Sequence, residues 1–319
     1  MKPAIAVVIG DPSGIAPEVC VKALATREPQ ARADFVLIGS IDAVRDAAEA
    51  AGLDLRFEPC REMPGERDER DVITVVDDGM LAKGDYTLGT ASAAAGRAVD
   101  RWMHTGLELA ARRAVAGLII APVDMTSFEL AGINVDAIFE PRDVFILRST
   151  GRLRTVPIAE HVMIRDVPAM IKTVTIANVI AIVDEQLRTW GFPSPKIAVA
   201  GLNPHAAGEE DVREIAPAVL AARSKGFDAA GPLSPDTVFR RGLLGEFDVV
   251  ITMYHDQGQI AVKTIGLEDA CAVYIGLPYV RVGIPHGSAL EIAGRNRAQH
   301  ATALHCMNTA ARLVSGGNL

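Results

Sequence analysis

Cysteine is scarce in this chain of 319 residues. It has four, Cys20, Cys60, Cys271 and Cys306, which lie far apart and form no C-x-x-C pair. This pattern suggests neither a zinc ribbon nor a disulfide framework. Reduced thiols are the ordinary state of cysteine in the cytoplasm, so we expect a cytoplasmic protein.

Blocks of positive charge and long apolar runs are also missing. The net charge is −8, and no cluster of Lys and Arg stands out, which argues against a nucleic-acid partner or an anionic membrane surface. No apolar run approaches the length of a membrane span. The apolar start, MKPAIAVVIG, is too short for a signal peptide and reads better as a first strand.

What the sequence does contain is ample material for a packed core. Apolar residues make up 49% and charged residues 23%, a globular composition, and the length exceeds that of one usual core, so two lobes are expected. Short β-branched runs alternate with Ala-rich stretches of helical pattern. The expected strands lie at 4–10, 34–39, 71–77, 117–123, 195–202, 247–255 and 270–278, and the expected helices at 16–25, 40–52, 90–114 and 213–226. This alternation predicts an α/β fold with a largely parallel sheet.

Polar motifs follow several of these strands. They are GDPSG after the first strand, APVD after the fourth, GLNPHAAGEE after the fifth and MYHDQG after the sixth. Ligands of parallel sheets gather at the carboxyl ends of strands, so these motifs are the candidates for a site. No internal repeat or obvious linker fixes a domain boundary.

Three of the seven histidines lie at or near strand ends or in the loops beyond them: His161, His205 and His255. The others include His104, His300 and His305, which fall in helical patterns and are expected to be solvated or packed. Three neutral imidazoles can hold a divalent transition metal and leave positions open for substrate. Their spacing is no metal motif in itself, so a capping or hydrogen-bonded loop histidine remains the alternative for each.

The dinucleotide fingerprint G-x-G-x-x-G is absent after the first strand. Its place is taken by GDPSG, in which Gly10, Asp11 and Gly14 form a tight turn before a helix start that can hold an anion. These three residues are candidates for cofactor binding. A plain strand-to-helix turn is the alternative.

Five motifs together resemble one family. They are GDPSGIAPE (10–18), GLNPHAAGEE (201–210), GPLSPDTVF (231–239), MYHDQGQIAVK (253–263) and GLPYVR followed by HGSALEIAG (276–294). In this order they resemble the 4-hydroxythreonine-4-phosphate dehydrogenase family of pyridoxine biosynthesis and its paralogues. The resemblance runs from the first strand to the start of the last helix.

The resemblance implies an NAD-dependent and metal-dependent oxidation of a secondary alcohol in a hydroxy acid, followed by loss of CO2. It implies a fold similar to isocitrate and isopropylmalate dehydrogenases, with two α/β lobes, an active site in the cleft and a homodimer that shares it. We expect residues 1–130 with 265–319 to form the lobe that carries the NAD loop. Residues 131–264 would form the second lobe, with the metal ligands and dimer contacts.

The resemblance also assigns roles to residues. Its three metal ligands fall on His161, His205 and His255, with Zn2+ expected and Mg2+, Mn2+ or Co2+ as substitutes. Lys263 would place positive charge on the substrate or deliver a proton, and Asp256 would orient a ligand imidazole or a metal-bound water. A further candidate for such support is Asp236. A solvated surface lysine and ordinary helix caps are the alternatives for these last three.

The HGSALEIAG motif resembles the loop that contacts the adenosine part of NAD in isocitrate and isopropylmalate dehydrogenases. His286, Gly287, Ser288 and Ala289 are therefore candidates for binding NAD or NADP. A small-residue loop lets the backbone approach the dinucleotide closely, and His286 would pack against adenine. A Gly-rich lead into a helix is the alternative.

The substrate residues of the family are mostly replaced here. Asp124 and Met125 stand where the family has Asn-Lys, EPRD (140–143) replaces a Gly-His-Thr-Glu box, and Ala272 replaces an Asn. The family's Arg survives as Arg281. Each lost charge-assisted hydrogen bond is worth about 1.5–3 kcal/mol.

These replacements favour a non-phosphorylated hydroxy acid, such as a dicarboxylate whose second carboxylate is bound by Arg142. A loop Arg142 paired with Glu140 or Asp143 is the alternative, and 4-hydroxythreonine-4-phosphate or a sugar-acid phosphate remains the other substrate class. Two further classes stay open: a phosphate acyltransferase of related fold, which needs no three-His metal site, and a ligand-binding paralogue without turnover. The kept histidines and HGSALEIAG argue against the latter.

Overall fold

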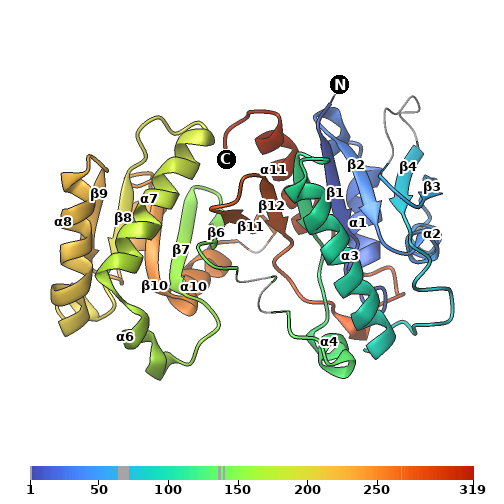
Figure 1. Ribbon diagram of the computed structural model, residues 1–319, viewed down its shortest axis with the longest axis horizontal. Helices are drawn as coiled ribbons and strands as arrows, with labels where there is room; N and C mark the ends of the chain where they lie inside the picture. The colour runs from blue at the N-terminus through green and yellow to red at the C-terminus, as the bar shows by residue number, and fades with distance from the viewer. Residues whose placement is uncertain (1, 64–71, 136–137, 139–140, 267) are drawn as a thin grey trace. The chain divides into compact units, whose positions relative to one another are not determined.

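Figure 1 shows the computed structural model of the chain, which describes residues 2–63, 72–135, 138, 141–266 and 268–319. The chain divides into two units. The first comprises Met1–Pro141 and Pro278–Gly316, and the second Arg142–Leu277 and Gly317–Leu319. Both are built of strands and helices in alternation, so the predicted α/β class is confirmed.

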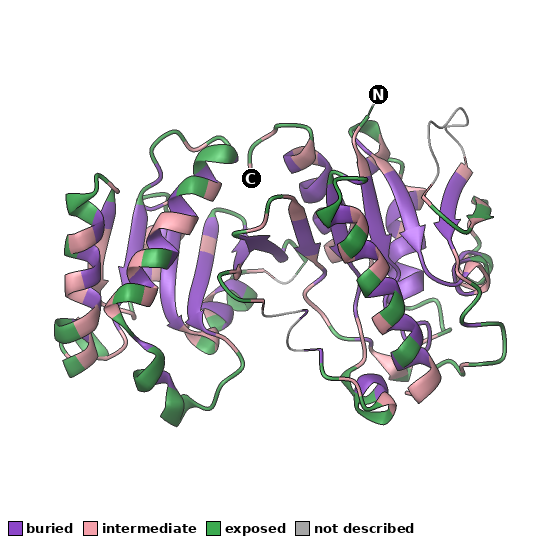
Figure 2. Cartoon of the chain, in the orientation of Figure 1, coloured by how far each residue is buried: buried purple, intermediate pink, exposed green. Residues whose placement is uncertain are grey.

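The sheet of the first unit has the strand order β3-β4-β2-β1-β5-β12, and every pair of neighbours in it is parallel. Its strands are β1 (Ala4–Val8), β2 (Asp34–Ile38), β3 (Arg56–Cys60), β4 (Val72–Val76), β5 (Gly117–Ile120) and β12 (Val280–Gly283). Apolar side chains of β1, β2 and β5 are almost fully buried, which explains why the sequence shows these strands as unbroken β-branched runs. In Figure 2 the arrows of β1 and β2 are mostly purple.

Helices cover this sheet on both faces. They are α1 (Ala16–Ala25), α2 (Ile41–Ala50), α3 (Ala93–Ala111), α4 (Met125–Ala131) and α11 (Ala301–Val314), with short 3-10 turns at Pro29–Ala31 and Leu290–Ile292. In Figure 1, α3 lies in front of β1, and α1 lies behind the strands and packs against α2 and α11. These are the crossover helices that a parallel sheet requires.

The sheet of the second unit has the order β11-β6-β7-β10-β8-β9. Its strands are β6 (Phe145–Thr150), β7 (Leu153–Ala159), β8 (Ile197–Ala200), β9 (Ala229–Leu233), β10 (Val249–Tyr254) and β11 (Cys271–Ile275). The pairs β7–β10, β10–β8 and β8–β9 are parallel, whereas β11–β6 and β6–β7 are antiparallel. The sheet is therefore largely parallel, with an antiparallel portion that the sequence did not indicate.

The helices of the second unit are α6 (Val167–Met170), α7 (Thr173–Thr189), α8 (Ala216–Ser224), α9 (Val238–Leu243) and α10 (His255–Ile265). A π-helix at Asp211–Ile215 leads into α8, and 3-10 turns lie at Ile164–Asp166 and Pro204–Ala206. Among the described residues no single helix is long and apolar enough to span a membrane; one pair, Ile164–Met170 with Thr173–Thr189, passes that test jointly but is bent by 85°.

The observed units differ from the expected lobes at three segments. Residues 131–141 group with the first unit, and residues 265–277 and 317–319 group with the second. The reason for the second difference is strand pairing, because β11 runs antiparallel to β6 from Cys271 opposite Ser149 to Ile275 opposite Phe145. No strand had been expected at β6, so the sequence offered no partner for β11 there.

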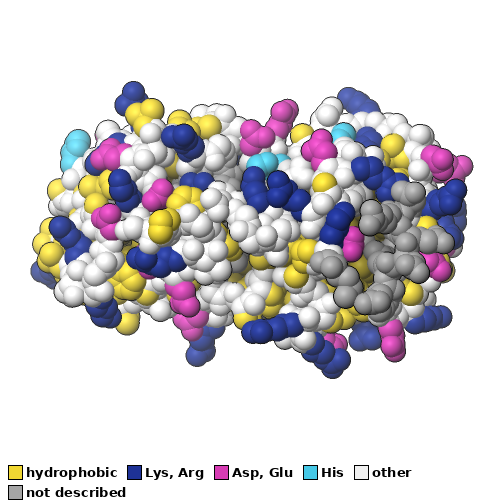
Figure 3. Space-filling model, turned by 90° about the horizontal axis from the view of Figure 1, so that it is seen from above, with side chains coloured by type: hydrophobic (Ala, Val, Ile, Leu, Met, Phe, Trp, Pro, Cys, Tyr) yellow, Lys and Arg dark blue, Asp and Glu magenta, His cyan; other side chains and the backbone are white. Residues whose placement is uncertain are grey.

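The distribution of charged side chains and the state of the cysteines agree with what the sequence predicts. On the face shown in Figure 3, Lys and Arg side chains are interspersed with Asp and Glu, as the lack of a basic block predicts. No disulfide joins the four cysteines.

Candidate functional site

Three adjacent parallel strands of the second unit end at one edge of its sheet. β7 lies beside β10, with Ala159 opposite Tyr254, and β10 lies beside β8, with Ile251 opposite Val199. Each strand is followed at once by a polar segment. The carboxyl ends of parallel strands meet at the same edge, so the three predicted histidines follow neighbouring strands of one sheet.

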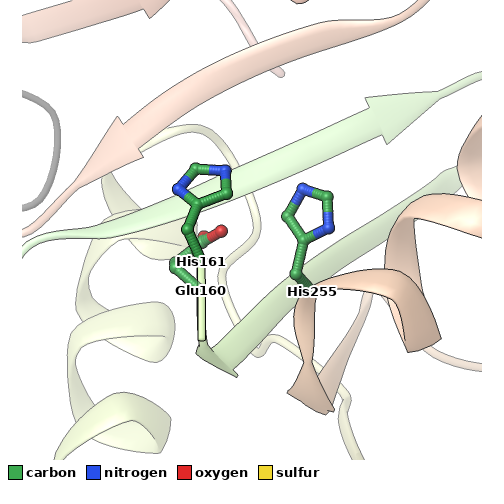
Figure 4. Close-up of side chains that lie close together, drawn as sticks. All are labelled: Glu160, His161 and His255. Atoms are coloured by element: carbon green, nitrogen blue, oxygen red, sulfur yellow. The ribbon is translucent and has the colours of Figure 1, made fainter. Parts of the chain in front are cut away.

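Two of these histidines lie side by side. The ring centroids of His161 and His255 are 5.1 Å apart. With Glu160 they form a group whose possible ligand atoms all lie within 4.8 Å of one another. Figure 4 shows both rings extending in the same direction from the end of β7 and the start of α10. His205 is outside this group, so the structure brings together two of the three predicted ligands and adds a carboxylate.

Glu160 is held by an arginine that the sequence analysis did not single out. Arg148 Nη1 and Nη2 donate to Glu160 Oε1 and Oε2 at 2.8 and 2.9 Å. The side chains are only 7% and 12% exposed. The geometry is the bidentate fork that fixes a carboxylate in one orientation.

The loop that carries His205 is strained and tightly anchored. His205 has φ 60° and ψ 12° in the 3-10 turn after β8, a left-handed conformation that non-glycine residues seldom adopt. Asp211, which is fully buried, accepts hydrogen bonds from the backbone nitrogens of Leu202 and Gly208 and from the Asn203 side chain. Buried hydrogen bonds of this kind can hold a strained residue in place.

The MYHDQG motif joins a strand end to a helix start. Tyr254 is the N-cap of α10, and His255 is its first residue. His255 Nδ1 lies 2.7 Å from Asp256 Oδ1. Gln257 receives a hydrogen bond from Met253 N and donates one to Gly201 O, so it ties the ends of β10 and β8 together.

The other catalytic candidates lie near this edge or along α10. Lys263 is exposed in the last turn of α10, two turns after His255. Asp236 accepts a hydrogen bond from the Ser234 hydroxyl at 2.7 Å, whereas the N-cap of α9 is Thr237, so Asp236 is not the N-cap residue. A groove of about 950 Å3 is lined by His205, Asp236 and Asp256 together with apolar side chains.

In the first unit, the glycines of GDPSG are required by close packing of the protein itself. Gly10 has φ +74°, and a Cβ there would lie 2.2 Å from Pro122 O. A Cβ on Gly14 would lie 2.5 Å from Ser288 O. Ile15 N donates to the same Ser288 carbonyl at 2.9 Å. The turn therefore packs directly against the ends of β5 and the HGSALEIAG segment.

Asp11 is fully buried in that turn. Its Oδ1 accepts from Ser13 N at 2.8 Å, and its Oδ2 has no hydrogen-bond partner among the described residues. Burial raises the pKa of Asp11, an effect that the neighbouring Ser127 and Ser13 partly offset and the carboxylate of Asp124 reinforces.

The HGSALEIAG segment combines an anchored serine with an open glycine. The Ser288 hydroxyl donates to Asp124 Oδ2 at 2.6 Å. Gly287 is exposed, and a Cβ there would meet nothing within 4 Å. Ala289 has φ 42°, and the segment then enters the 3-10 turn Leu290–Ile292 instead of leading directly into α11.

His286 has an unused ring nitrogen. Its Nδ1 lies 3.1 Å from Gly287 O, and its Nε2 is buried with no hydrogen-bond partner among the described residues. Burial lowers the pKa of His286, since the charged imidazolium loses its hydration. A buried ring nitrogen of this kind is an available hydrogen-bonding atom for a ligand.

The substrate candidates are distributed over both units. Arg142 is exposed at the start of the second unit, and the adjacent Asp143 accepts from Asn178 Nδ2 at 3.4 Å. Glu140 lies outside the described residues. Arg281 is only 1% exposed in β12 of the first unit.

Comparison with known proteins decides the family. The profile of the family described as "Pyridoxal phosphate biosynthetic protein PdxA" matches residues 31–310. The chain belongs to the PdxA family.

Two curated PdxA-family relatives align over nearly the whole chain. One is a putative 4-hydroxythreonine-4-phosphate dehydrogenase of Novosphingobium aromaticivorans, 38% identical over 99% of this chain and 96% of its own. The other is a D-threonate 4-phosphate dehydrogenase of Salmonella typhimurium, 33% identical over 92% and 94% of the two chains.

Solved structures agree. A 4-hydroxythreonine-4-phosphate dehydrogenase from Klebsiella pneumoniae matches with a TM-score of 0.87 and 31% identity over 99% of both chains. A terephthalate 1,2-cis-dihydrodiol dehydrogenase from Burkholderia xenovorans matches with a TM-score of 0.69 and 27% identity, covering 100% of this chain and 99% of its own.

Four residues of this PdxA-family chain gained importance only from the structure: Glu160, Arg148, Asp211 and Asp124. Glu160 stands beside a predicted ligand in the sequence, which is a local signal. Arg148 interrupts the apolar run of β6. Its partner, Glu160, lies 12 residues further along the chain, after the end of β7. Such pairings depend on the β6–β7 hairpin, which the sequence analysis did not predict.

Proposed function

We propose that this chain is a dehydrogenase that uses NAD or NADP and a divalent metal ion to oxidise the secondary alcohol of a hydroxy acid. The observation that carries the proposal is the pair of His161 and His255, whose ring centroids lie 5.1 Å apart at the carboxyl edge of the second sheet. Neighbouring imidazoles fit a divalent metal ion, with Zn2+ as the expected one and Mg2+, Mn2+ or Co2+ as substitutes. Bound there, such an ion would supply Lewis-acid polarisation of the alcohol oxygen.

Neighbouring side chains prepare the histidines for this task. Asp256 Oδ1 accepts a hydrogen bond from Nδ1 of His255. Because the proton is then on Nδ1, the lone pair of Nε2 is available to bind a metal ion. His205 is proposed as a further ligand through the shared site of a homodimer, because it lies outside the group formed within one chain. Lys263 would place positive charge on the substrate or deliver a proton.

The HGSALEIAG segment fits the cofactor. Open space at Gly287 lets a dinucleotide approach the backbone, and the buried Nε2 of His286 offers a hydrogen-bonding atom. Asp124 holds Ser288, and hence the segment, in place. The glycines at 10 and 14 are explained by packing, so they support the segment rather than add an independent argument for the cofactor.

For the substrate we propose a non-phosphorylated hydroxy acid, and loss of CO2 after its oxidation. Exposed Arg142 would bind a second carboxylate through its fork. Met125 and Ala272 are apolar residues at the positions where the family is expected to have Lys and Asn. The structural neighbour from Burkholderia xenovorans is named for a terephthalate dihydrodiol, which is not a phosphate.

A phosphorylated substrate is the second candidate. The relatives named for 4-hydroxythreonine-4-phosphate and D-threonate 4-phosphate are 38% and 33% identical to this chain, and the Klebsiella structure has a higher TM-score than the dihydrodiol dehydrogenase. These names favour a phosphate ester, whereas the replaced residues Asp124, Met125 and Ala272 argue against one.

One screen separates the two candidates. Purified, metal-replete protein is offered NAD or NADP with paired hydroxy acids that do or do not carry phosphate, and both reduced cofactor and CO2 are measured. We expect turnover of a non-phosphorylated acid, with CO2 released in step with the reduced cofactor. Efficient turnover of the phosphorylated acids alone would reject our substrate assignment, and reduced cofactor without CO2 would reject decarboxylation.

A further inference from the structure

The carboxylate of Glu160 lies close to the rings of the two histidines. Its possible ligand atom lies within 4.8 Å of those of His161 and His255. In Figure 4 the carboxylate lies beside His161, on the side that faces His255. All three residues sit at the ends of β7 and β10, whose register is fixed by a parallel ladder. Their proximity is therefore set by the sheet itself.

Burying the ion pair of Glu160 with Arg148 costs more desolvation free energy than a contact that only stabilises the fold would justify. Both side chains are nearly buried, at 7% and 12% exposure. Taking two charges out of water costs free energy that their attraction often fails to recover, and apolar pairs of similar volume commonly do as well or better. A buried pair placed directly beside His161 is better explained by a requirement for a carboxylate at that point.

The geometry of the pair leaves room for another bond. A carboxylate has about four lone-pair positions on its two oxygens, and Arg148 takes one on each. A cation could bind at one of the remaining positions. Carboxylates that bind metal ions are themselves held by hydrogen bonds from neighbouring groups. Arg148 donates such hydrogen bonds to Glu160.

We propose that Glu160 is a metal ligand of this protein, oriented by Arg148, so that one chain contributes two imidazoles and one carboxylate. The inference rests on the proposed metal-dependent function and adds a ligand to the predicted histidines. It also assigns Arg148 a positioning role as the counter-charge of Glu160 when no ion is bound.

The test measures zinc binding without any turnover. Competitive titration against a chromophoric chelator gives the Zn2+ dissociation constant of the wild type, Glu160→Gln and the double variant Glu160→Met/Arg148→Met. The double variant removes both charges and so guards against misfolding of the single one. We expect zinc affinity to fall at least about tenfold in both, the scale on which groups around a metal ion act.

A matched control comes from the same unit. Asp184 is also a buried carboxylate, 4% exposed, and Arg188 Nε donates to it at 2.6 Å. Neither residue of this pair belongs to the metal-binding group. Asp184→Asn should therefore lower thermal stability without changing zinc affinity.

Arg148→Met gives a result that a purely structural pair would not. This variant keeps Glu160 but loses the two hydrogen bonds that orient its carboxylate, so zinc affinity should fall by about tenfold or more even though the proposed ligand is still present. Wild-type zinc affinity in Glu160→Gln and the double variant would overturn the role of Glu160 alone. A wild type that binds no zinc would overturn the metal-dependent function as well.

Discussion

The Ser288 hydroxyl donates a hydrogen bond of 2.6 Å to Asp124 Oδ2, although the two residues are 164 positions apart. The other oxygen of Asp124 caps α4 by accepting from Ser127 N at 3.1 Å. One carboxylate therefore joins the segment after β12 to the loop after β5. Asp124 stands where the family resemblance has Asn, so in this chain the group that accepts from Ser288 is a carboxylate and not an amide.

Ser288→Ala should weaken cofactor binding by removing that link. A hydrogen bond to a charged group is worth about 1.5–3 kcal/mol, which corresponds to roughly a tenfold or larger rise in the Kd for NAD or NADP. Asp124→Ala should produce the same rise and in addition lose about 1 kcal/mol of stability with the helix cap. Calorimetric titration and thermal melting measure both. An unchanged Kd in Ser288→Ala would contradict the positioning role, and zinc affinity serves as the control.

His161→Ala and His255→Ala should each lose bound metal and turnover while keeping the fold, since both side chains lie at the surface of the sheet edge. His161 is exposed and His255 is about a quarter exposed. Metal content after dialysis and circular dichroism are the measurements. His104→Ala, which removes an exposed histidine of α3, is the control. Retained metal and full activity in the double variant of His161 and His255 would reject the site.

Stability should fall below about pH 6.5 on account of His286. Burial lowers its pKa in the folded protein, so the unfolded chain binds a proton that the folded chain resists. The free energy of unfolding is thus highest above the unfolded pKa and is lost as the pH falls toward the folded one. Urea unfolding at several pH values should show a shallower loss in His286→Gln than in the wild type. An identical pH dependence in the two proteins would disprove this assignment.

Arg142→Ala should reduce kcat/KM for the true substrate by an amount near 1.5–3 kcal/mol, with little change in cofactor binding. The loss should be confined to substrates that carry a second carboxylate. Arg165→Ala removes another exposed arginine of the same unit and should have no effect. If Arg142→Ala leaves the kinetics unchanged, the residue is an ordinary loop arginine.

Mixing His161→Ala with His205→Ala should restore activity if the site is shared between subunits of a C2 dimer. Half of the randomly mixed dimers would be heterodimers, each with one intact site of two, so about a quarter of the native activity is expected. Size-exclusion chromatography verifies that both variants dimerise. No recovery in verified heterodimers, or a monomer that is fully active, would exclude the shared site.

Much of the framework was accessible from the sequence because it depends on local patterns. The apolar runs at β1, β2, β4, β5, β8, β10 and β11 were each expected within a few residues of their observed bounds. Strands buried on both faces must be apolar throughout, so they leave a plain signal. The expectation that polar motifs follow these strands correctly placed His255 and the GDPSG turn.

Strands with mixed composition escaped prediction. β6 contains Arg148 and β7 contains Pro157, and β3, β9 and β12 are short or half-buried. A charged residue within a strand opposes the apolar pattern unless a distant partner neutralises it. That partner, Glu160, is known only once the hairpin is formed.

The sequence by itself determined the α/β class, the family and the residues at the strand ends, because these follow from periodicity and motif. Only the tertiary structure decided which of those residues meet. The register of β7 against β10 brings Glu160, His161 and His255 together, while the strained turn after β8 leaves His205 outside their group. Proximity of a few ångströms depends on strand order and register, which are set by packing across the whole sheet and not by any local run of residues.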